Sequence, residues 1–441
     1  MHHDVAILGA GFGGSLAALI AKQMGMNPIL IEKGKHPRFA IGESSTPQAN
    51  IALQHIAEKY NLPRLKPLVT YGTWKETYPD LSCGPKRGFT YIHHGSAGGE
   101  LLIAANASQY EADTHWYRAD VDNFFVNEVK QAGIPYFDST DVKLTSVNSW
   151  KLSSENFSCT ADFLIDATGG ANPLGIPQDL SNIQTNSRVL FAHFTGVTPW
   201  GELHGKPEHP YPCHDAALHH VFSGGWMYVL HFDNGITSAG FVLDMEKRPC
   251  DTWESLMNEF PLIREQFQHA ERSTELVLTN RIQRCATSFV GENWAMLPNA
   301  AYCIDPLHST GNAHTLCCVD RLMQSFGNAQ ALRVYESTMR EEIVLIDQLV
   351  RGSYACMHDF DSFANYVMLY FAGADFSERK RRSNQRTGFL NSQDEKYKST
   401  VALWYTRAVS GQTIRNLAND LEPWNMVGLC DPTKQNMYDY A

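Results

Sequence analysis

The sequence predicts a large α/β protein organised around a parallel sheet, and three stretches carry that prediction. Residues 4–8 form an apolar run that leads through a glycine-rich turn into a helical pattern at 15–24. Residues 163–166 and 295–297 have the character of further buried strands, each followed by small or polar residues. Buried strands that alternate with helices are typical of α/β folds. With 441 residues, of which 43% are apolar, the chain can bury a core shared by two or three structural units.

The overall composition excludes several classes of function. The chain has 36 basic and 47 acidic residues and a formal net charge of -11. A general nucleic-acid or anionic-membrane surface needs clustered Lys and Arg, and the one basic run, 379–382, is short enough to be a solvated patch. No apolar run approaches the ~20 residues that span a bilayer. We therefore expect no nucleic-acid partner and no membrane partner.

Cysteine usage and the first residues bear on the compartment. The ten cysteines are scattered without a Cys-x-x-Cys pair, in a chain too large to need disulfide staples. Residues 1–4 lead directly into the first strand, without the basic region and apolar run of a secretion signal. We expect reduced thiols and a cytoplasmic location.

The opening segment has the pattern of a dinucleotide cradle. Gly9 permits a tight turn, Gly11 lets the backbone approach a pyrophosphate, and Gly14 allows close packing of the helix on the sheet. The helix N-terminus attracts phosphate, and Glu32, which ends a strand at 28–31, can hold ribose hydroxyls. A purely structural glycine turn is the alternative, but the order of strand, turn, helix, strand and acid favours the nucleotide site.

Two downstream segments indicate FAD rather than NAD. Gly169 belongs to an Ala-Thr-Gly-Gly turn after the strand at 163–166, a position at which flavoproteins return the chain to the nucleotide crevice. Asp305 begins the loop Asp-Pro-Leu-His-Ser-Thr-Gly at 305–311, and a helical pattern follows. Such a junction directs backbone N–H groups toward an anion or an electron-rich ring edge. We predict a Rossmann-like FAD-binding domain of the flavin monooxygenase type.

The rest of the chain is predicted to add a substrate domain and a helical region. We expect the strand-rich stretches at 141–159 and 188–243 to form one inserted antiparallel sheet that carries the substrate chamber. The predicted division is a FAD-binding domain at 1–187 with interleaved cap segments around 60–115, a mainly β substrate region at 188–280, a return to the FAD-binding domain at 281–330, and a helical C-terminal lid at 331–441.

Four stretches, in this order along the chain, resemble the flavin-dependent halogenases, especially the aminopyrrolnitrin-type branch. They are HPRFAIGESSTP at 36–47, WYRADVD at 116–122, LHHVFSGGW at 218–226 and DPLHSTG at 305–311. In that family FADH2 and oxygen form a flavin hydroperoxide, a bound halide is oxidised to hypohalous acid, and the acid travels through a short tunnel to the substrate. The resemblance implies FAD, supplied as FADH2 by a separate flavin reductase, a halide ion, and an electron-rich aromatic substrate. It leaves open whether that substrate is free or carrier-bound, and whether the protein is a homo-oligomer.

The resemblance assigns catalytic work to two residues. Lys86, in Gly-Pro-Lys-Arg-Gly-Phe, resembles the tunnel lysine that captures or hydrogen-bonds the oxidised halogen. The alternative for Lys86 is a surface cation after a turn. His308 stands where tryptophan-type members carry a catalytic glutamate, and a histidine there can bind the substrate or transfer a proton. The alternative for His308 is a packed, hydrogen-bonded side chain.

The halide and the tunnel wall are also assigned by resemblance. The family binds the halide at backbone amides that correspond to Ser309, Thr310 and Gly311, and such donors hold an anion without a fixed positive charge. A loop that only caps a helix beneath the flavin is the alternative. Trp226 and Tyr228 stand in the place of the family's Trp-x-Trp-x-Ile-Pro signature, of which only the first Trp is kept. The resemblance implies that they line the tunnel or substrate wall; the alternative is that they simply occupy alternate positions on one face of a strand.

Further cofactor contacts follow from the same resemblance. Arg38 and Ser44, together with Glu43 and Pro47, lie in the stretch that covers the flavin in the family. Arg118 precedes a helical segment, and related flavoproteins use such an arginine near FAD; an ion pair with a neighbouring aspartate is the alternative. Gly291-Glu292 resembles the Gly-Asp pair of flavin hydroxylases, in which the acid meets the ribityl chain.

The leading hypothesis is an FADH2-dependent halogenase. The alternative is an FAD-dependent aromatic hydroxylase that uses NAD(P)H, or an isoprenoid reductase on the same scaffold, and direct reduction of the flavin by NADPH would identify either. A flavin-binding redox sensor or scaffold is a third hypothesis, which the retained Lys86 and 305–311 loop oppose. The chain has no second glycine-rich nucleotide motif, which agrees with reduced flavin arriving from outside.

Overall fold

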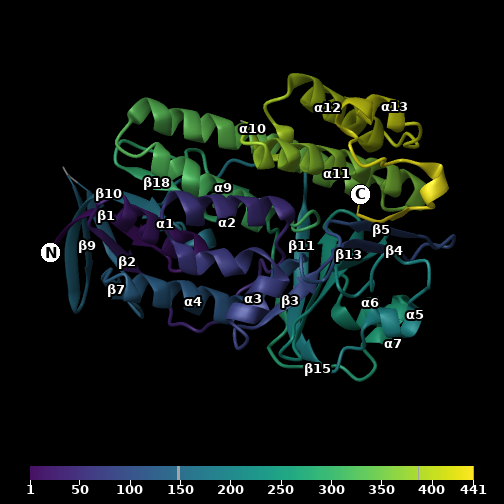
Figure 1. Ribbon diagram of the computed structural model, residues 1–441, viewed down its shortest axis with the longest axis horizontal. Helices are drawn as coiled ribbons and strands as arrows, with labels where there is room; N and C mark the ends of the chain where they lie inside the picture. Colours follow the sequence, from purple (N-terminus) through teal and green to yellow (C-terminus); the bar gives the residue numbers. More distant parts are fainter. Residues whose placement is uncertain (147–148, 386, 441) are drawn as a thin grey trace.

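The computed structural model describes residues 1–146, 149–385 and 387–440. Figure 1 shows a mixed α/β molecule in which two main sheets lie at opposite ends of the long axis, and the C-terminal helices run along one side of both. This arrangement confirms the predicted fold class. The domain boundaries given above stay a prediction.

The first sheet holds the strands on which the fold prediction depended. Its order is β7-β2-β1-β10-β9-β8, with β18 added beside β10. The central strand β1 pairs in parallel with β2 and β10, and β10 pairs in parallel with β18. The members are β1 (His2–Leu8), β2 (Pro28–Ile31), β7 (Tyr136–Phe137), β8 (Lys143–Ser146), β9 (Trp150–Ser154), β10 (Phe157–Asp166) and β18 (Trp294–Met296). The four strands predicted for the parallel core therefore all belong to it.

Helix α1 (Phe12–Gln23) is buried on every side over its first ten residues. It packs between the sheet and two helices, α4 (Arg118–Gln131) and α9 (Thr310–Gln324). Glycine makes this close approach possible. A Cβ atom on Gly14 would lie 1.9 Å from the carbonyl oxygen of Gly9, and one on Gly9, whose φ is +95°, would lie 2.5 Å from that of Ala167. At this turn, β1, α1 and the end of β10 therefore pack too closely for any residue larger than glycine at positions 9 and 14.

The second sheet differs from the expectation in two ways. Its order is β15-β11-β14-β13-β12-β4-β5-β20, with β16 beside β11. The prediction that 141–159 belongs to it is wrong, because a two-residue turn at 155–156 folds β9 back onto β10 in the first sheet. Residues 88–104 supply two strands instead, and β12 pairs with β4 in parallel, so the sheet is not wholly antiparallel.

The strands of the second sheet come from distant parts of the chain. They are β4 (Gly88–His93), β5 (Glu100–Ala104), β11 (Ser187–Thr195), β12 (Ala217–Phe222), β13 (Gly225–His231), β14 (Thr237–Asp244), β15 (Glu271–Arg272), β16 (Val277–Leu278) and β20 (Met437–Tyr438). Two small two-stranded sheets complete the set, β3 (Cys83–Lys86) with β6 (Asp113–Trp116) and β17 (Arg284–Cys285) with β19 (Tyr302–Cys303). The pairing of β20 with β5 returns the C-terminal segment to this sheet.

The C-terminal region is helical, as predicted. Its helices are α10 (Ala329–Cys356), α11 (Phe360–Arg382), α12 (Glu395–Val409) and α13 (Ala418–Leu421). The side chains of Asn328, Asp359 and Asp394 cap the first three by accepting hydrogen bonds from backbone N–H groups. Helices α2 (Pro47–Lys59), α3 (Tyr71–Thr77), α5 (Trp200–His204), α6 (Trp253–Glu259), α7 (Pro261–Gln266) and α8 (Pro298–Ala301) lie earlier in the chain.

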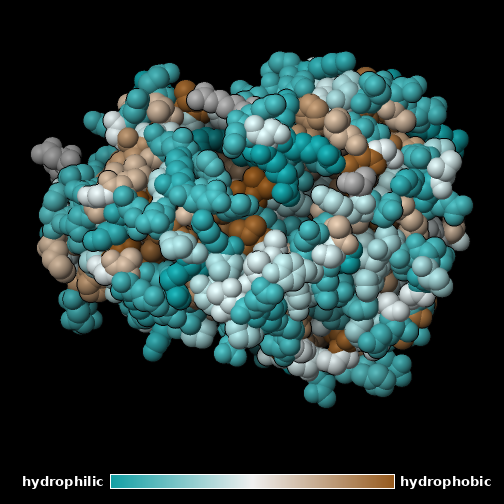
Figure 2. All heavy atoms as spheres, in the orientation of Figure 1, coloured by the Kyte–Doolittle hydropathy of each residue, from teal (hydrophilic) through white to brown (hydrophobic). Residues whose placement is uncertain are grey.

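The surface is mainly hydrophilic on the face seen in Figure 2, where hydrophobic side chains gather in small patches near the middle. Within the described residues, no helix combines the length and the apolar character needed to cross a membrane. All ten cysteines are free thiols, and most are buried.

Replacing Gly14 by Ala tests the contact at the glycine turn. We expect Gly14→Ala to destabilise the protein by about 3 kcal/mol or more, because the added methyl group overlaps the Gly9 carbonyl. Thermal or urea unfolding monitored by circular dichroism measures the change. Gly11→Ala is the matched control, since its nearest atoms lie 3.6 Å away. Equal stability of the two variants would contradict the close packing.

Candidate active site

A large cavity lies beside the carboxyl ends of β1, β2 and β10, where α/β proteins bind their ligands. Its volume is about 1130 Å³, which accommodates a large cofactor. The cavity brings together most of the residues predicted from sequence: Gly9, Gly11, Gly14, Glu32, Arg38, Ser44, Arg118, Gly169, Trp226, Tyr228, Asp305, Ser309, Thr310 and Gly311. Lys86 and His308 do not line it.

Glu32 holds the loops at the nucleotide end of the cavity. One carboxylate oxygen accepts a 2.8 Å hydrogen bond from the Ala10 N–H, and the other accepts one of 2.8 Å from the Gly34 N–H. Arg38 Nη2 lies 3.7 Å from the same carboxylate. The glycine cradle, the acid and the adjacent cation fit the ribose and phosphates of a dinucleotide.

Arg118 both forms an ion pair and faces the cavity. Its Nε and Nη2 donate to the Asp122 carboxylate at 3.0 and 2.9 Å, so the aspartate alternative considered above describes a real contact. Its Nη1 also donates to the carbonyl oxygens of Ile41 and Gly42. The guanidinium group therefore fixes the segment that covers the cavity to the start of α4.

Ser44 and Ser45 connect the loop before α9 with Lys86. The hydroxyl of Ser309 donates to that of Ser44 at 3.1 Å, and Lys86 Nζ donates to the Ser45 carbonyl oxygen at 2.6 Å. Ser45 is itself held against β6, since its N–H donates to the Thr114 carbonyl oxygen at 3.1 Å. The predicted halide loop and the predicted tunnel lysine are thus separated by two consecutive residues.

Lys86 is fully buried at the end of β3, so the surface-cation alternative is wrong. Its Nζ lies 4.0 Å from the centre of the Phe89 ring, and that ring stacks on His219, which lines the cavity. Burial lowers the pKa of Lys86 to about 7, and the nearby carboxylate of Asp113 opposes that shift. The lysine lies behind the cavity wall rather than in the open cavity.

The loop before α9 offers fewer backbone donors than expected. The Ser309 N–H donates to the Pro306 carbonyl oxygen at 2.9 Å, so this amide is not available for a halide. The amides of Thr310 and Gly311 belong to the first turn of α9, whose N–H groups have no partner within the helix. The side-chain Nδ2 of Asn312, which sequence reasoning missed, is buried at the cavity without an acceptor among the described residues. These three donors together suit an anion.

His308 is packed beneath the cavity floor. Its ring stacks on Tyr370 at a centroid distance of 4.4 Å, and its Nε2 lies 3.4 Å from the Ser353 hydroxyl. Burial lowers the pKa of His308 to about 3, so the ring is neutral near pH 7. These contacts favour the packed role over a catalytic one.

Trp226 and Tyr228 share one face of β13, and both are buried at the cavity wall. The Trp226 Nε1 donates to the Tyr354 hydroxyl at 3.0 Å, and that hydroxyl donates to Asp305 at 2.9 Å. Burial raises the pKa of Asp305 to about 6. The aromatic wall is therefore connected to the loop that begins α9.

Two acidic residues that the resemblance places near the flavin differ in position. Glu43 lines the cavity, and its Oε1 lies 2.8 Å from the Nε2 of the buried His193. The proposed Gly-Asp equivalent is wrong, because Glu292 is exposed and does not line the cavity. Asn299, at the start of α8, lines it instead.

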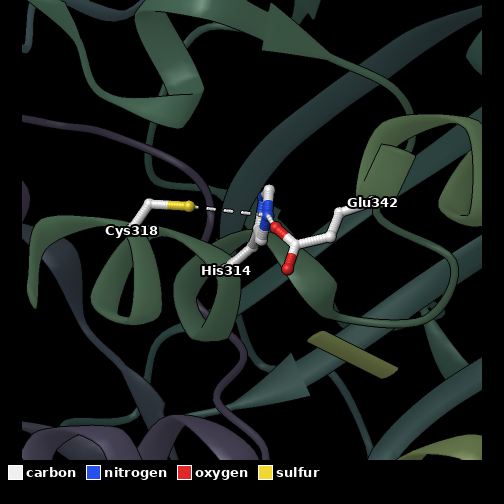
Figure 3. A group of neighbouring side chains, drawn as sticks. All are labelled: His314, Cys318 and Glu342. Atoms are coloured by element: carbon white, nitrogen blue, oxygen red, sulfur yellow. Dashed lines mark hydrogen bonds and ion pairs between the residues drawn. The ribbon is translucent and has the colours of Figure 1, made fainter. Parts of the chain in front are cut away.

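Beneath the cavity, a buried ion-pair network holds α9 against α10. Figure 3 shows His314 and Cys318 of α9 beside Glu342 of α10. The Glu342 carboxylate accepts hydrogen bonds from His314 at 2.7 Å, from Arg321 twice at 2.8 Å, and from the Phe389 N–H at 3.0 Å. Four donors satisfy both oxygens, so the cluster is an ion-pair network and not a metal site.

Replacing Glu342 by Gln tests this network. Burial disfavours the carboxylate, but Arg321 and His314 hold the pKa of Glu342 well below its usual range. We expect Glu342→Gln to cost about 3–5 kcal/mol near pH 7, because Arg321 loses its partner. An unfolded glutamate has a pKa of ~4.3 and the folded value is lower, so the stabilisation is complete above about pH 5 and is lost as the pH falls further.

Chemical unfolding at pH 7 and at pH 3 measures the difference between wild type and variant. The control is Asp375→Asn, which removes a partly exposed ion pair with Arg379 on α11 and has an expected cost of about 0.5 kcal/mol. A Glu342→Gln effect as small as that of the control, or one that does not shrink at low pH, would contradict a stabilising ionised Glu342.

Sequence comparison identifies related proteins. The chain is 26% identical to tetracycline 7-halogenase of Kitasatospora aureofaciens over 90% of its own length and 77% of the relative's. It is 29% identical to monodechloroaminopyrrolnitrin halogenase PrnC of Pseudomonas fluorescens, over 73% of this chain and 61% of PrnC. The second match thus covers less than two thirds of the relative. No family model matches the chain.

Comparison with solved structures agrees. The halogenase PltM, in complex with phloroglucinol and FAD, superposes with a TM-score of 0.87 over 96% of this chain and 94% of PltM, at 21% identity. The flavin-dependent brominase Bmp2 gives a TM-score of 0.63 at 17% identity, over 99% of this chain and 97% of Bmp2. At such identities these likenesses show a shared fold. The sequence relatives and the shared fold together show that this chain is similar to flavin-dependent halogenases.

Proposed function

We propose that this protein halogenates an electron-rich aromatic ring with a halide, reduced FAD and oxygen. The observation that carries the proposal is the short connection between the anion-binding loop and Lys86 through Ser44 and Ser45. A halide oxidised at the loop would therefore lie near the buried ammonium group of Lys86, with only Ser44 and Ser45 between them. A hydroxylase needs neither a halide site nor a buried lysine.

The residues of the chain divide the work by position. The glycine cradle, Glu32 and Arg118 would hold FAD. In its reduced form the flavin would activate oxygen, and the activated oxygen would oxidise the halide to hypohalous acid. The amides of Thr310 and Gly311 bind the halide. Lys86 donates an N–H to the hypohalous acid, and the apolar wall in front of it excludes water and so prevents loss of the acid.

A phenolic substrate fits the chamber better than an apolar ring. Trp226 and Tyr228 offer aromatic surfaces for stacking. The Glu43 carboxylate, at the same cavity, can accept a hydrogen bond from a ring hydroxyl. PltM was crystallised with phloroglucinol, a phenol, whereas another relative is named as a brominase of a carrier-bound pyrrole. We propose a free phenol as the substrate of this chain.

We further propose that a separate flavin reductase supplies FADH2. The sequence offers one glycine-rich nucleotide motif, at residues 9–14, which the FAD cradle uses. A cytoplasmic location is proposed as well, and the ten free thiols support it. The hydroxylase alternative has less support, because the relatives reported above are named as halogenases.

Lys86→Met tests the proposed function with little change of side-chain volume. Purified protein would be incubated with FAD, a flavin reductase, NADH and oxygen, and with chloride, bromide or iodide separately, in the presence of a panel of phenols. We expect halogenated product from the wild type and a loss of about 100-fold or more in the variant, because the proton donor is absent. Mass spectrometry measures the product.

The control is Lys143→Met, which removes an exposed lysine on β8 and should leave the rate unchanged. Both variants should bind FAD as the wild type does, since neither lysine lines the cavity. Hydroxylated product without a halide requirement, or flavin reduction by NADPH without the reductase, would instead identify the hydroxylase alternative.

A further inference from the structure

A second buried charge lies directly opposite Lys86. Asp113 begins β6, and the antiparallel pairing of β3 with β6 places it in register with Lys86. The lysine is 0% exposed and the aspartate 2% exposed. Residues opposite each other on antiparallel strands have neighbouring side chains. The lysine therefore has a carboxylate beside it that the proposed function does not yet use.

Asp113 is held in place, but its hydrogen-bonding capacity is incompletely used. Asn50 Nδ2 donates to Asp113 Oδ1 at 2.6 Å, whereas Oδ2 has no hydrogen-bond partner among the described residues. Lys86 has three N–H donors, and one of them goes to the Ser45 carbonyl oxygen. An oriented carboxylate with an unpartnered oxygen thus lies across the strand pair from an ammonium group that has unused donors.

Other charged groups surround the pair. Glu378 of α11 lies near Lys86, but burial raises the pKa of Glu378 well above its usual value and so disfavours its charged form. Arg382 of the same helix acts on Asp113. His115 and His219 are the neighbouring bases, and burial lowers the pKa of each to about 3, so both are neutral near pH 7. Asp113 is therefore the main acidic partner of Lys86.

We propose that Asp113 is the positioning residue that keeps Lys86 protonated in this dry site, so that the ammonium group serves as the proton donor to hypohalous acid. This role rests on the halogenase function proposed above. Asp113 does not touch the substrate and acts through the lysine.

The reaction step balances with one proton entering and one leaving. The aromatic carbon forms a bond to the halogen while the halogen–oxygen bond breaks, and Lys86 gives a proton to the departing hydroxide, which leaves as water. The ring then loses the proton of the substituted carbon, and that proton restores the Lys86–Asp113 pair. The net change is aromatic C–H plus hypohalous acid to aromatic carbon–halogen plus water.

Burial is the reason that the lysine needs this partner. Removal from water lowers the pKa of Lys86, and the charge of Asp113 raises it again, to a value of about 7. Burial likewise raises the pKa of Asp113 to about 7, and Lys86 opposes that rise. Without the carboxylate, Lys86 would lose its proton at a lower pH and would no longer be a donor at neutrality.

Asp113→Asn tests this role, because asparagine retains the shape and the oxygen that Asn50 contacts. Protein labelled with ¹³C at lysine Cε would be titrated by NMR, with the Lys86 signal assigned by its absence in Lys86→Met. We expect the Lys86 titration in Asp113→Asn to move down by about 1 pH unit or more. The alkaline limb of the halogenation rate profile should move down by the same amount.

Three further variants separate charge from folding. Asp113→Glu should restore both the titration and the rate profile, because it restores a carboxylate. Glu378→Gln, at the neighbouring acidic side chain, should shift both less than Asp113→Asn does, because burial disfavours the charged form of Glu378. If Asp113→Asn fails to fold, Asn50→Ala provides the second test. Loss of the Asn50 hydrogen bond disfavours the charged form of Asp113 and should therefore lower the pKa of Lys86 as well.

An unchanged Lys86 titration in Asp113→Asn would overturn the proposal. A shifted Lys86 titration with an unchanged rate profile would also overturn the proposal, because the Lys86 proton that Asp113 stabilises would then not be used by the reaction. A wild-type protein that gives no halogenated product overturns the proposed function and the catalytic role with it. The NMR titration of the same protein still shows whether Asp113 retains the proton of Lys86, so the two failures are distinguishable.

Discussion

The arrangement of the active site depends on the hydrogen bonds of one short segment, Glu43 to Thr46. Its backbone pairs with β6, its Ser44 hydroxyl meets Ser309 of the anion-binding loop, and its Ser45 carbonyl accepts from the Lys86 ammonium group. A backbone carbonyl is an acceptor that no side-chain substitution removes, and in a dry interior an ammonium group needs such a partner. The segment thereby connects the loop before α9 with Lys86, while Arg118 holds the residues just before it, Ile41 and Gly42.

The parallel core could be predicted from sequence because its signals are local. Gly9, Gly11 and Gly14 sit between a buried strand and a helix, an order that is typical of dinucleotide-binding folds. The second sheet was harder to predict. A two-residue turn directs β9 to the first sheet, whereas the second recruits β4, β5 and β20 from stretches far apart in sequence, and neither choice is visible in strand propensity. Strand partners depend on long-range packing that a single sequence does not display.

In the candidate site, too, the features set by local motifs could be predicted, and the features set by long-range packing could not. Residues that belong to a motif, such as Glu32, Arg118 and Trp226, lie at the cavity, since a motif carries its own geometry. Burial was not visible: Lys86 follows Gly-Pro and precedes Arg, a pattern typical of an exposed turn, yet it is among the most enclosed side chains. The Ser309 amide and Glu292 were misassigned because backbone hydrogen bonding and loop direction decide both. The signal for Asn312 was a polar side chain in the first turn of a helix that begins at a cavity.

We infer that an anion site at the start of α9 lies next to the segment that holds Lys86. A crystal structure of the protein with FAD and bromide, collected at a wavelength where bromine scatters anomalously, tests for this site. We expect an anomalous peak within hydrogen-bonding distance of the Thr310 and Gly311 amides and the Asn312 side chain. A protein that binds FAD but shows no bromide there, or shows it only at surface cations, would contradict an anion site next to Lys86.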